Sequence, residues 1–295
     1  MMPLFLLKWI LRWVKSRAQW RNIPRTRKGF DKATRWNHPH PDCARKQEVI
    51  AGVPAEWIIP PDAPEGKVLL YLHGGGYNAG TIRNYHGFVS RIALAANRTT
   101  LLIEYRLAPE HPHPAALEDA VAVYQELLLR GYTPASMAIG GDSAGGGLTM
   151  ATLLYLRDHQ HELPACAFLL SPWADLTQSG DSFHSKEKAE PMLINEAMGE
   201  WAANYAGTMD HRNPYISPLW GDLGGLCPIY IQVGSEEILL DDSVRLASRA
   251  SEAGTMVRLE IYPRFFHVFQ AFYRLLPTAR KAIKKLGAFI QAFTD

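Results

Sequence analysis

Short apolar runs alternate with longer helix-favouring stretches from about residue 67 to the C-terminus. Short apolar runs bounded by turn residues predict buried strands, and the longer stretches predict helices. The expected strands are 67–72, 99–104, 137–139, 165–170, 229–233 and 257–262, and the expected helices are 85–96, 115–130, 148–157, 195–206, 241–253 and 278–293. This alternation predicts an α/β fold, with a mostly parallel sheet and helices on both faces.

The N-terminal part follows a different pattern. Two strand-like pieces, 48–53 and 55–59, are preceded by an irregular proline-rich segment and, over residues 1–28, by a helical repeat of apolar residues. The apolar side carries Phe5, Leu6, Trp9, Ile10 and Trp13, and the other side carries Lys8, Arg12 and Lys15. This amphipathic helix is too short and too charged to span a bilayer. It is expected either to dock its tryptophan-rich face on the main domain as a lid or to lie on an anionic membrane surface.

The regular alternation breaks in the second half of the chain. Residues from about 176 to 226 are polar and rich in proline and glycine, and only 195–206 predicts a helix. This segment is expected to be an insertion that covers one edge of the sheet. The chain therefore divides into an N-terminal helical cap (1–45) and a catalytic domain (46–295) that contains the second piece of the cap.

Composition and charge refine this picture. The 295 residues are 47% hydrophobic and 20% charged, which is ordinary for a globular enzyme. The net charge is +2, yet residues 1–36 hold ten Lys or Arg and one acid, a local charge of +9. No nucleic-acid recognition motif accompanies this charge, so nucleic acid is not an expected partner. Three widely spaced cysteines favour buried reduced thiols and a cytoplasmic location.

One serine lies in a glycine-lined turn between an expected strand and an expected helix. The stretch Gly141-Asp-Ser-Ala-Gly145 has the G-x-S-x-G form of a nucleophile elbow. Its glycines allow a turn too tight for flanking side chains, and Ser143 is expected to project from the sheet edge. The pattern also occurs by chance, so it needs support from elsewhere in the chain.

A second glycine-rich loop supplies that support. Strand 67–72 runs directly into His73-Gly-Gly-Gly76, and consecutive glycines after a buried strand indicate a close approach of the backbone to another group. In α/β-hydrolases, the loop at this position provides part of the oxyanion hole. The two loops are expected to face one another at the carboxyl ends of neighbouring strands.

Three sequence blocks together resemble a known family. The blocks are His73-Gly-Gly-Gly76, the stretch from Tyr105-Arg-Leu-Ala-Pro-Glu to Leu-Glu-Asp119, and Gly141-Asp-Ser-Ala-Gly-Gly146. Their order and spacing resemble the hormone-sensitive-lipase-like family of bacterial carboxylesterases, and the similarity extends from about residue 45 to the C-terminus. The resemblance implies an α/β-hydrolase fold with a cap, hydrolysis of short to medium acyl esters, and neither metal nor cofactor.

A serine–acid–histidine triad is expected in that chain order. Ser143 is the expected nucleophile, and His267 is the expected base because it is the one histidine after the last predicted strand. Laying the family's Asp-Pro-Leu-x-Asp pattern on this chain puts Glu237 in the place of the acid, where the family usually has aspartate. Asp241 is kept as the alternative acid, although Asp241 and Asp242 also suit a helix N-terminus.

Other site residues follow from the same resemblance. The oxyanion is expected to accept hydrogen bonds from the backbone N–H groups of Gly75, Gly76 and Ala144. His73 and Gly74 are expected to shape the first loop, and Asp142 is expected to brace nearby loops. Three aromatic residues next to these loops line either a substrate pocket or the ordinary core: Tyr77, Trp173 and Phe266.

Rival functions share the same scaffold. An amidase or arylformamidase would use the same triad, an interfacial lipase would use the tryptophan-rich N-terminus as an anchor, and a non-catalytic receptor would be expected to lack the histidine. The expected partner is a small ester, with weak membrane contact and a homodimer through strand 257–262 as further possibilities.

Overall fold

The computed structural model describes residues 2–18, 20–35 and 37–295. Its strands are β1 (Ala44–Ile50), β2 (Val53–Ile59), β3 (Val68–Leu72), β4 (Thr99–Ile103), β5 (Met137–Asp142), β6 (Cys166–Leu170), β7 (Ile229–Gly234) and β8 (Val257–Tyr262). In the described residues they form one eight-stranded sheet in the order β1-β2-β4-β3-β5-β6-β7-β8. Only the pairs β1–β2 and β2–β4 are antiparallel, which confirms the mostly parallel sheet.

The predicted strand 48–53 is wrong in its bounds. Within those residues β1 ends at Ile50, and Ala51 and Gly52 turn the chain with φ angles of 50° and 83°. Residues with positive φ favour a tight hairpin turn. The segment is therefore the end of one strand and the turn to β2, and the two strands pair in an antiparallel hairpin.

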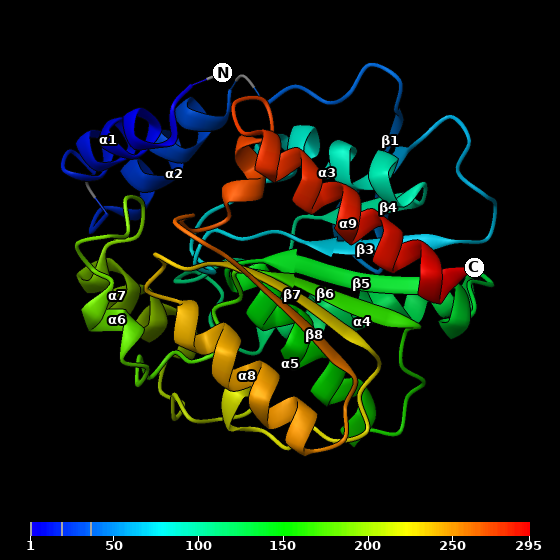
Figure 1. Cartoon of the computed structure of the whole chain (residues 1–295). Helices are drawn as coiled ribbons and strands as arrows, with labels where there is room; N and C mark the ends of the chain where they lie inside the picture. The colour runs from blue at the N-terminus through cyan, green and yellow to red at the C-terminus, as the bar shows by residue number, and fades with distance from the viewer. Residues whose placement is uncertain (1, 19, 36) are drawn as a thin grey trace.

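Helices cover both faces of the sheet (Figure 1). They are α3 (Ile82–Ala96), α4 (Ala115–Leu129), α5 (Ala144–Asp158), α8 (Leu240–Glu252) and α9 (Pro277–Thr294), with short 3-10 turns η1 (Pro134–Ser136), η2 (Pro218–Trp220) and η3 (Phe269–Phe272). Figure 1 shows α3 and α9 on one face and α4, α5 and α8 on the other. The expected α/β-hydrolase architecture is confirmed.

The central strand β3 explains why the sheet is buried on both sides. All five of its residues are buried, and successive side chains point to opposite faces. Val68, Leu70 and Leu72 join the core on one face, whereas Leu69 and Tyr71 join the core on the other. Each buried leucine stabilises the fold by about 1.5–3 kcal/mol. The strand next to it, β5, carries the serine turn at its carboxyl end.

Four further helices gather at one end of the sheet (Figure 1). They are α1 (Leu4–Lys15) and α2 (Ile23–Thr34) from the N-terminal part, and α6 (Ser182–Ser185) and α7 (Asn195–Ala206) from the mid-chain segment. The predicted range 1–28 includes residues 1 and 19, which lie outside the described residues. Helix α2 extends into the segment that was expected to be irregular. Its start is stabilised by Asn22, whose side chain accepts a hydrogen bond from the N–H of Arg25.

Helix α1 lies with the opposite face inward from the one expected for a lid. Phe5, Trp9 and Trp13 are 76%, 63% and 51% exposed, whereas Lys8 is only 8% exposed. The prediction that the tryptophan-rich face docks on the main domain is therefore wrong. The inward face instead carries Leu7, which is 4% exposed, with Leu4 and Leu11 packed against the core, and the Lys8 ammonium group beside them pairs with Glu236. Among the described helices, none has the length and apolar character needed to cross a membrane.

Candidate active site

Ser143 occupies a strained turn between β5 and α5. Its φ and ψ angles are 54° and −122°, a region that costs a non-glycine residue about 1–3 kcal/mol. A Cβ atom on Gly141 or Gly145 would lie 2.2 or 2.0 Å from the carbonyl oxygen of Leu72. Only glycine lets β3 and the turn approach this closely, so the two flanking glycines make the elbow geometry possible.

The loop that follows β3 is equally dependent on glycine. Gly75 and Gly76 have φ angles of 116° and 63°, and a Cβ on Gly75 would lie 2.1 Å from the carbonyl oxygen of Ala79. Because β3 and β5 are adjacent parallel strands, this loop and Ala144 at the start of α5 follow neighbouring strand ends. The structure therefore brings together the two segments that carry the expected oxyanion donors.

Asp142 joins the elbow to the loop after β3. Its Oδ1 accepts hydrogen bonds from the hydroxyl of Tyr71 at 2.8 Å and from the N–H of Gly74 at 3.1 Å, and its Oδ2 accepts one from the hydroxyl of Tyr85 at 3.1 Å. Burial raises the pKa of Asp142 to about 6, and these hydrogen bonds limit the rise. The carboxyl thus links β5, the glycine loop and α3.

His73 is enclosed by aromatic rings. It stacks between Tyr85 and Tyr105, with ring centroids 5.2 and 4.3 Å apart, and it is fully buried. Burial lowers the pKa of His73 to about 4, so the imidazole is neutral at neutral pH. A Cβ on Gly80 would lie 2.4 Å from its Nδ1 atom. These contacts fix the ring under the loop and leave it unsuited to act as a base.

His267 and Glu237 form a buried pair from two separate loops. Nδ1 of the imidazole lies 3.0 Å from Oε2 of Glu237, and the two residues are 4% and 0% exposed. Oε1 of the same carboxylate accepts hydrogen bonds from the Ser171 hydroxyl at 2.7 Å and from the Gly234 N–H at 2.5 Å. The Ser171 hydroxyl in turn accepts one from the N–H of Val268. Both carboxylate oxygens are therefore oriented, one by the protein frame and one by the imidazole.

Charge governs the state of this imidazole. Burial by itself lowers the pKa of His267, but the hydrogen bond and charge of Glu237, with the charges of Glu190 and Asp142, raise it above its ordinary value of 6.5. The charges of Asp142 and His267 also stabilise one another. The surroundings therefore favour the imidazolium form.

The alternative acid points elsewhere. Oδ2 of Asp241 accepts a hydrogen bond from the N–H of Ser182, and Oδ2 of Asp242 accepts two, from the N–H groups of Ala174 and Asp175. Asp241 and Asp242 lie in the first turn of α8, as the sequence predicts, but neither side chain makes a capping hydrogen bond to that helix. The N–H groups of the 174–182 segment compete successfully for both carboxylates.

The three candidate pocket aromatics are buried. Tyr77, Trp173 and Phe266 are at most 1% exposed. Tyr77 stacks on Tyr205 of α7 with centroids 3.7 Å apart, and its ring centroid is 6.0 Å from that of Trp173. Tyr77 and Trp173 belong to the core on one face of the sheet and Phe266 to the core on the other. These positions fit the core alternative that the sequence left open.

Comparison with known proteins decides the family. Residues 69–271 match the family model described as alpha/beta hydrolase fold. An acetyl-hydrolase of Streptomyces hygroscopicus is 45% identical over 241 residues, which cover 81% of this chain and 80% of the relative. A crystal structure of an esterase from the bacterial hormone-sensitive lipase family superposes with a TM-score of 0.96 at 38% identity and 100% coverage of both chains. A crystal structure of EstE5, soaked with p-nitrophenyl butyrate, superposes with a TM-score of 0.94 at 40% identity, covering 100% of this chain and 99% of that one.

The chain belongs to the hormone-sensitive-lipase-like carboxylesterases of the α/β-hydrolase fold. It is a serine carboxylesterase, and its reaction is the hydrolysis of carboxylic esters. A serine–acid–histidine mechanism is a general feature of this family. The relatives do not favour the amidase, lipase or receptor alternatives.

Two residues of the esterase site were not anticipated from the sequence. Ser171 orients Glu237, as described above, and Trp201 of α7 covers the glycine loop. A Cβ on Gly76 would lie 2.2 Å from the Trp201 ring, whose N–H donates to the carbonyl oxygen of Trp20 at 3.4 Å. The segment around Ser171 was visible as the end of a strand, but Trp201 has no local signal because its role depends on how α7 packs.

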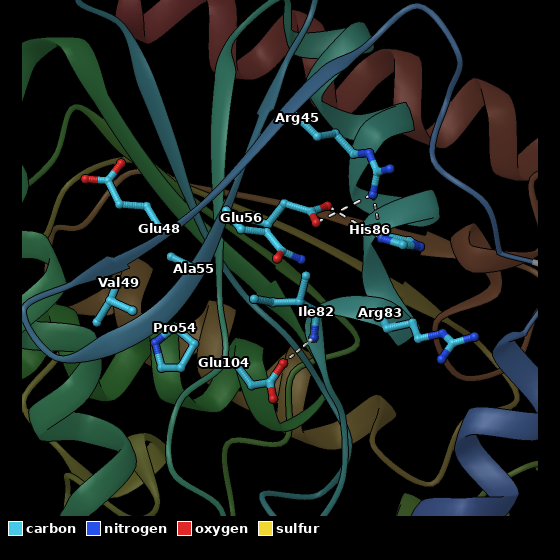
Figure 2. A pocket seen from close by; sticks show the side chains of 11 residues that line it. Arg45, Glu48, Val49, Pro54, Ala55, Glu56, Ile82, Arg83, His86 and Glu104 are labelled. Atoms are coloured by element: carbon cyan, nitrogen blue, oxygen red, sulfur yellow. Dashed lines mark hydrogen bonds and ion pairs between the residues drawn. The ribbon is translucent and has the colours of Figure 1, made fainter.

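A separate pocket lies at the β1 edge of the sheet (Figure 2). It has a volume of about 610 Å³ and lies between the β1–β2 hairpin and the start of α3, and none of the proposed catalytic residues lines it. Its buried Glu56 is 3.6 Å from Arg45 and 3.5 Å from His86, and Glu104 accepts the N–H of Ile82. The buried charge is paired within the protein. In the part of the chain that the structure describes, no cluster of three or more His, Cys, Asp or Glu side chains could hold a metal.

Proposed function

We propose that Ser143, His267 and Glu237 are the catalytic triad of this esterase. The observation that carries the proposal is the 3.0 Å contact between Nδ1 of His267 and Oε2 of Glu237 at the end of the sheet where the Ser143 elbow lies. The carboxylate fixes the imidazole tautomer and stabilises the imidazolium that forms during the reaction. Glutamate performs this task here because Ser171 and Gly234 hold its second oxygen.

The reaction then has two steps. Ser143 Oγ attacks the ester carbonyl and transfers its proton to His267, which passes it to the departing alcohol. Water, deprotonated by His267, releases the acid from the acyl-serine. The tetrahedral oxyanion accepts hydrogen bonds from the N–H groups of Gly75, Gly76 and Ala144, each worth about 2.7–4 kcal/mol of barrier. His73, Gly74 and Asp142 hold the loop that carries two of these donors.

Short to medium acyl esters are the proposed substrates. The comparison proteins include an acetyl-hydrolase and an esterase soaked with a butyrate ester, and both acyl groups are short. Trp201 adds a bulky ring directly over Gly76 and supports a confined acyl site. Residues 1–45 and the insertion at about 176–226 are proposed to form the cap that confines it.

Chain-length profiling with a nucleophile variant tests the function. Wild-type protein and Ser143→Ala are compared on p-nitrophenyl esters from acetate to palmitate. The expected result is a maximum at short chains without activation at an emulsion interface, and a loss of about 10⁶ in kcat for Ser143→Ala. Rising activity on long-chain emulsions that disappears when residues 1–20 are deleted would favour the lipase instead.

The exposed aromatic face of α1 supports weak contact with an anionic membrane surface as an additional property. Phe5, Trp9 and Trp13 form this face, and the guanidinium of Arg17 lies 4.0 Å from the centroid of the Trp13 ring. Aromatic side chains beside cations suit the interface of a negatively charged bilayer. Sedimentation with phosphatidylserine vesicles is the test, and no binding at low salt would remove this proposal.

A homodimer through β8 and a cytoplasmic location are further proposals. β8 is an edge strand of the sheet, with Ile261 45% exposed, and edge strands are available for pairing with a second chain. The three cysteines are buried and free, which suits a reducing compartment. Nucleic acid is not a proposed partner. Sedimentation equilibrium of the protein with and without Ile261→Lys tests the dimer.

A further inference from the structure

A further buried acidic residue, Glu190, lies in the cap segment that helix α1 contacts, within electrostatic reach of His267. Glu190 lies in the mid-chain segment of the cap, between α6 and α7, and is 1% exposed. Oε1 of its carboxyl accepts hydrogen bonds from the N–H groups of Met192 and Leu193 at 2.8 and 3.4 Å. Oε2 is buried and accepts no hydrogen bond from any described residue. A buried carboxyl with one oxygen unpaired is costly, so its presence needs an explanation.

The charged groups around Glu190 explain why a carboxyl is buried there. The charges of His267 and Glu237 both act on the Glu190 carboxyl, and the charge of Glu190 acts in turn on His267. Burial raises the pKa of Glu190 to about 7, with His267 opposing the rise and Glu237 adding to it. Two carboxyls from different parts of the chain therefore act on the imidazole. Glu237 comes from the loop after β7 and bonds directly, and Glu190 comes from the cap and acts through space.

Helix α1 holds the segment that carries this carboxyl. Arg12 donates a hydrogen bond to the carbonyl oxygen of Ala189, and Lys15 donates one to that of Glu190, each at 3.0 Å. One turn earlier, Lys8 pairs at 2.6 Å with Glu236, the residue before the triad acid. The spacing of these cations puts them on one face of α1. That face therefore contacts both segments that bring acids to His267.

We propose that Glu190 is a positioning residue of the active site, which stabilises the His267 imidazolium from the cap side and is held in place by the cations of α1. The inference rests on the proposed triad. When Ser143 Oγ bonds to the ester carbon, its proton moves to Nε2 of His267, and the imidazole gains a positive charge. An ionised Glu190 lowers the energy of that charge, and no bond to Glu190 forms or breaks.

The sign of the pH dependence follows from the charges that face the group. They are His267 and Glu237 from the catalytic domain, Lys15 from α1 with Glu187 and Glu196 around it, and Asp142, which acts on His267. The pKa of His267 is raised, so kcat/KM is expected to fall as pH drops through a value above 6.5. Removing the Glu190 charge lowers the pKa of His267 and moves this acid limb to lower pH.

The test is the pH profile of Glu190→Gln on a neutral short-chain ester. Glutamine keeps the oxygen that accepts from Met192 and Leu193, and it removes the charge. We expect the acid limb to move to lower pH, and plateau kcat to fall roughly tenfold with little change in KM, because the imidazolium formed in the transition state loses one stabilising charge. Glu190→Asp is expected to restore part of both effects. The matched control is Asp181→Asn, an exposed acid of the same mid-chain segment, which should leave the profile unchanged.

Two results overturn the inference. One is a wild-type acid limb in Glu190→Gln, whether kcat is kept or reduced, because a merely structural role would not move the pKa of His267. The other, if Glu190→Gln fails to fold, is a wild-type limb in Glu190→Asp, which keeps Lys15 in place, draws the carboxylate back by one methylene and is expected to move the limb in the same direction by less. Failure of the triad is distinguishable, since in that case Glu237→Gln would retain activity.

Discussion

The serine elbow and helix α1 lie at the same end of the molecule and are built by opposite rules. At the elbow, backbone contacts decide the structure: the carbonyl oxygen of Leu72 leaves no room for a Cβ on Gly141 or Gly145. On α1, the inward face combines leucines that pack against the core with long cations that find distant partners. Lys8 is buried with Glu236, while Trp9 and Trp13 are exposed.

The difference shows what local sequence can determine. The elbow is a contact between segments whose geometry only glycine satisfies, so its glycines are visible in the sequence itself. The orientation of α1 depends on Glu236, Ala189 and Glu190, which lie more than 170 positions away along the chain. A stripe of leucines on α1 faces the core, as expected of an amphipathic helix, and the cations beside it are accommodated there by carboxylate and carbonyl partners.

The largest expected effect breaks the catalytic side of the comparison. Glu237→Gln leaves His267 without the carboxylate that orients it, and we expect kcat to fall about 10⁴-fold. Asp241→Asn is the matched control and should retain near-wild-type kcat, because Asp241 bonds to Ser182. Steady-state kinetics on p-nitrophenyl acetate measures both. The reverse order of losses would make Asp241 the triad acid.

A substitution in the glycine loop should have the next largest effect. Gly75→Ala adds a Cβ 2.1 Å from the carbonyl oxygen of Ala79 at a φ of 116°. The loop must shift, and we expect a loss of about 10²–10³ in kcat, comparable to the loss of one oxyanion donor. Gly29→Ala is the control, since nothing lies within 4 Å of a Cβ there. Equal activity of the two variants would show that the loop conformation is not needed for the reaction.

The cap residue Trp201 tests whether the two regions meet over the substrate. Trp201→Ala removes the ring that covers Gly76. We expect the ratio of kcat/KM for octanoate over butyrate esters to rise roughly tenfold, because space for added methylenes is worth about that much. The neighbouring exposed Glu200→Ala should leave the ratio unchanged. An unaltered ratio in Trp201→Ala would separate the ring from acyl selection.

The smallest effect is expected on the exposed side of α1. Replacing Phe5, Trp9 and Trp13 together by alanine removes no buried contact of these rings, so activity on soluble acetate esters should change less than about twofold. Vesicle binding should be lost in the same variant, and Leu129→Ala, an 83% exposed control, should keep it. A large loss of soluble activity would mean that this face packs on the catalytic domain after all.

Much of the fold was predictable because periodicity and glycine patterns act locally. The six strands after residue 66 and helix Asn195–Ala206 are present where the apolar runs and helix formers indicate. The acid was harder, since Glu237 and Asp241 are both near the right strand end and only the three-dimensional path directs one to His267. Ser171, Trp201 and Glu190 could not be found locally, because each acts through a segment distant in sequence. Two local signals mark features that the periodicity does not show. Asn22 and Pro24 are typical of a helix start and mark the beginning of α2, and Gly52 marks the turn between β1 and β2.

The most direct measurement is covalent labelling with a p-nitrophenyl alkylphosphonate, which reacts irreversibly with an activated serine. Peptide mapping by mass spectrometry identifies the labelled residue. The triad predicts one phosphonyl group per chain, on Ser143, with no label in Ser143→Ala and strongly slowed labelling in Glu237→Gln. Label on any other residue, or full labelling and activity in Ser143→Ala, would contradict the assignment of Ser143 as the nucleophile.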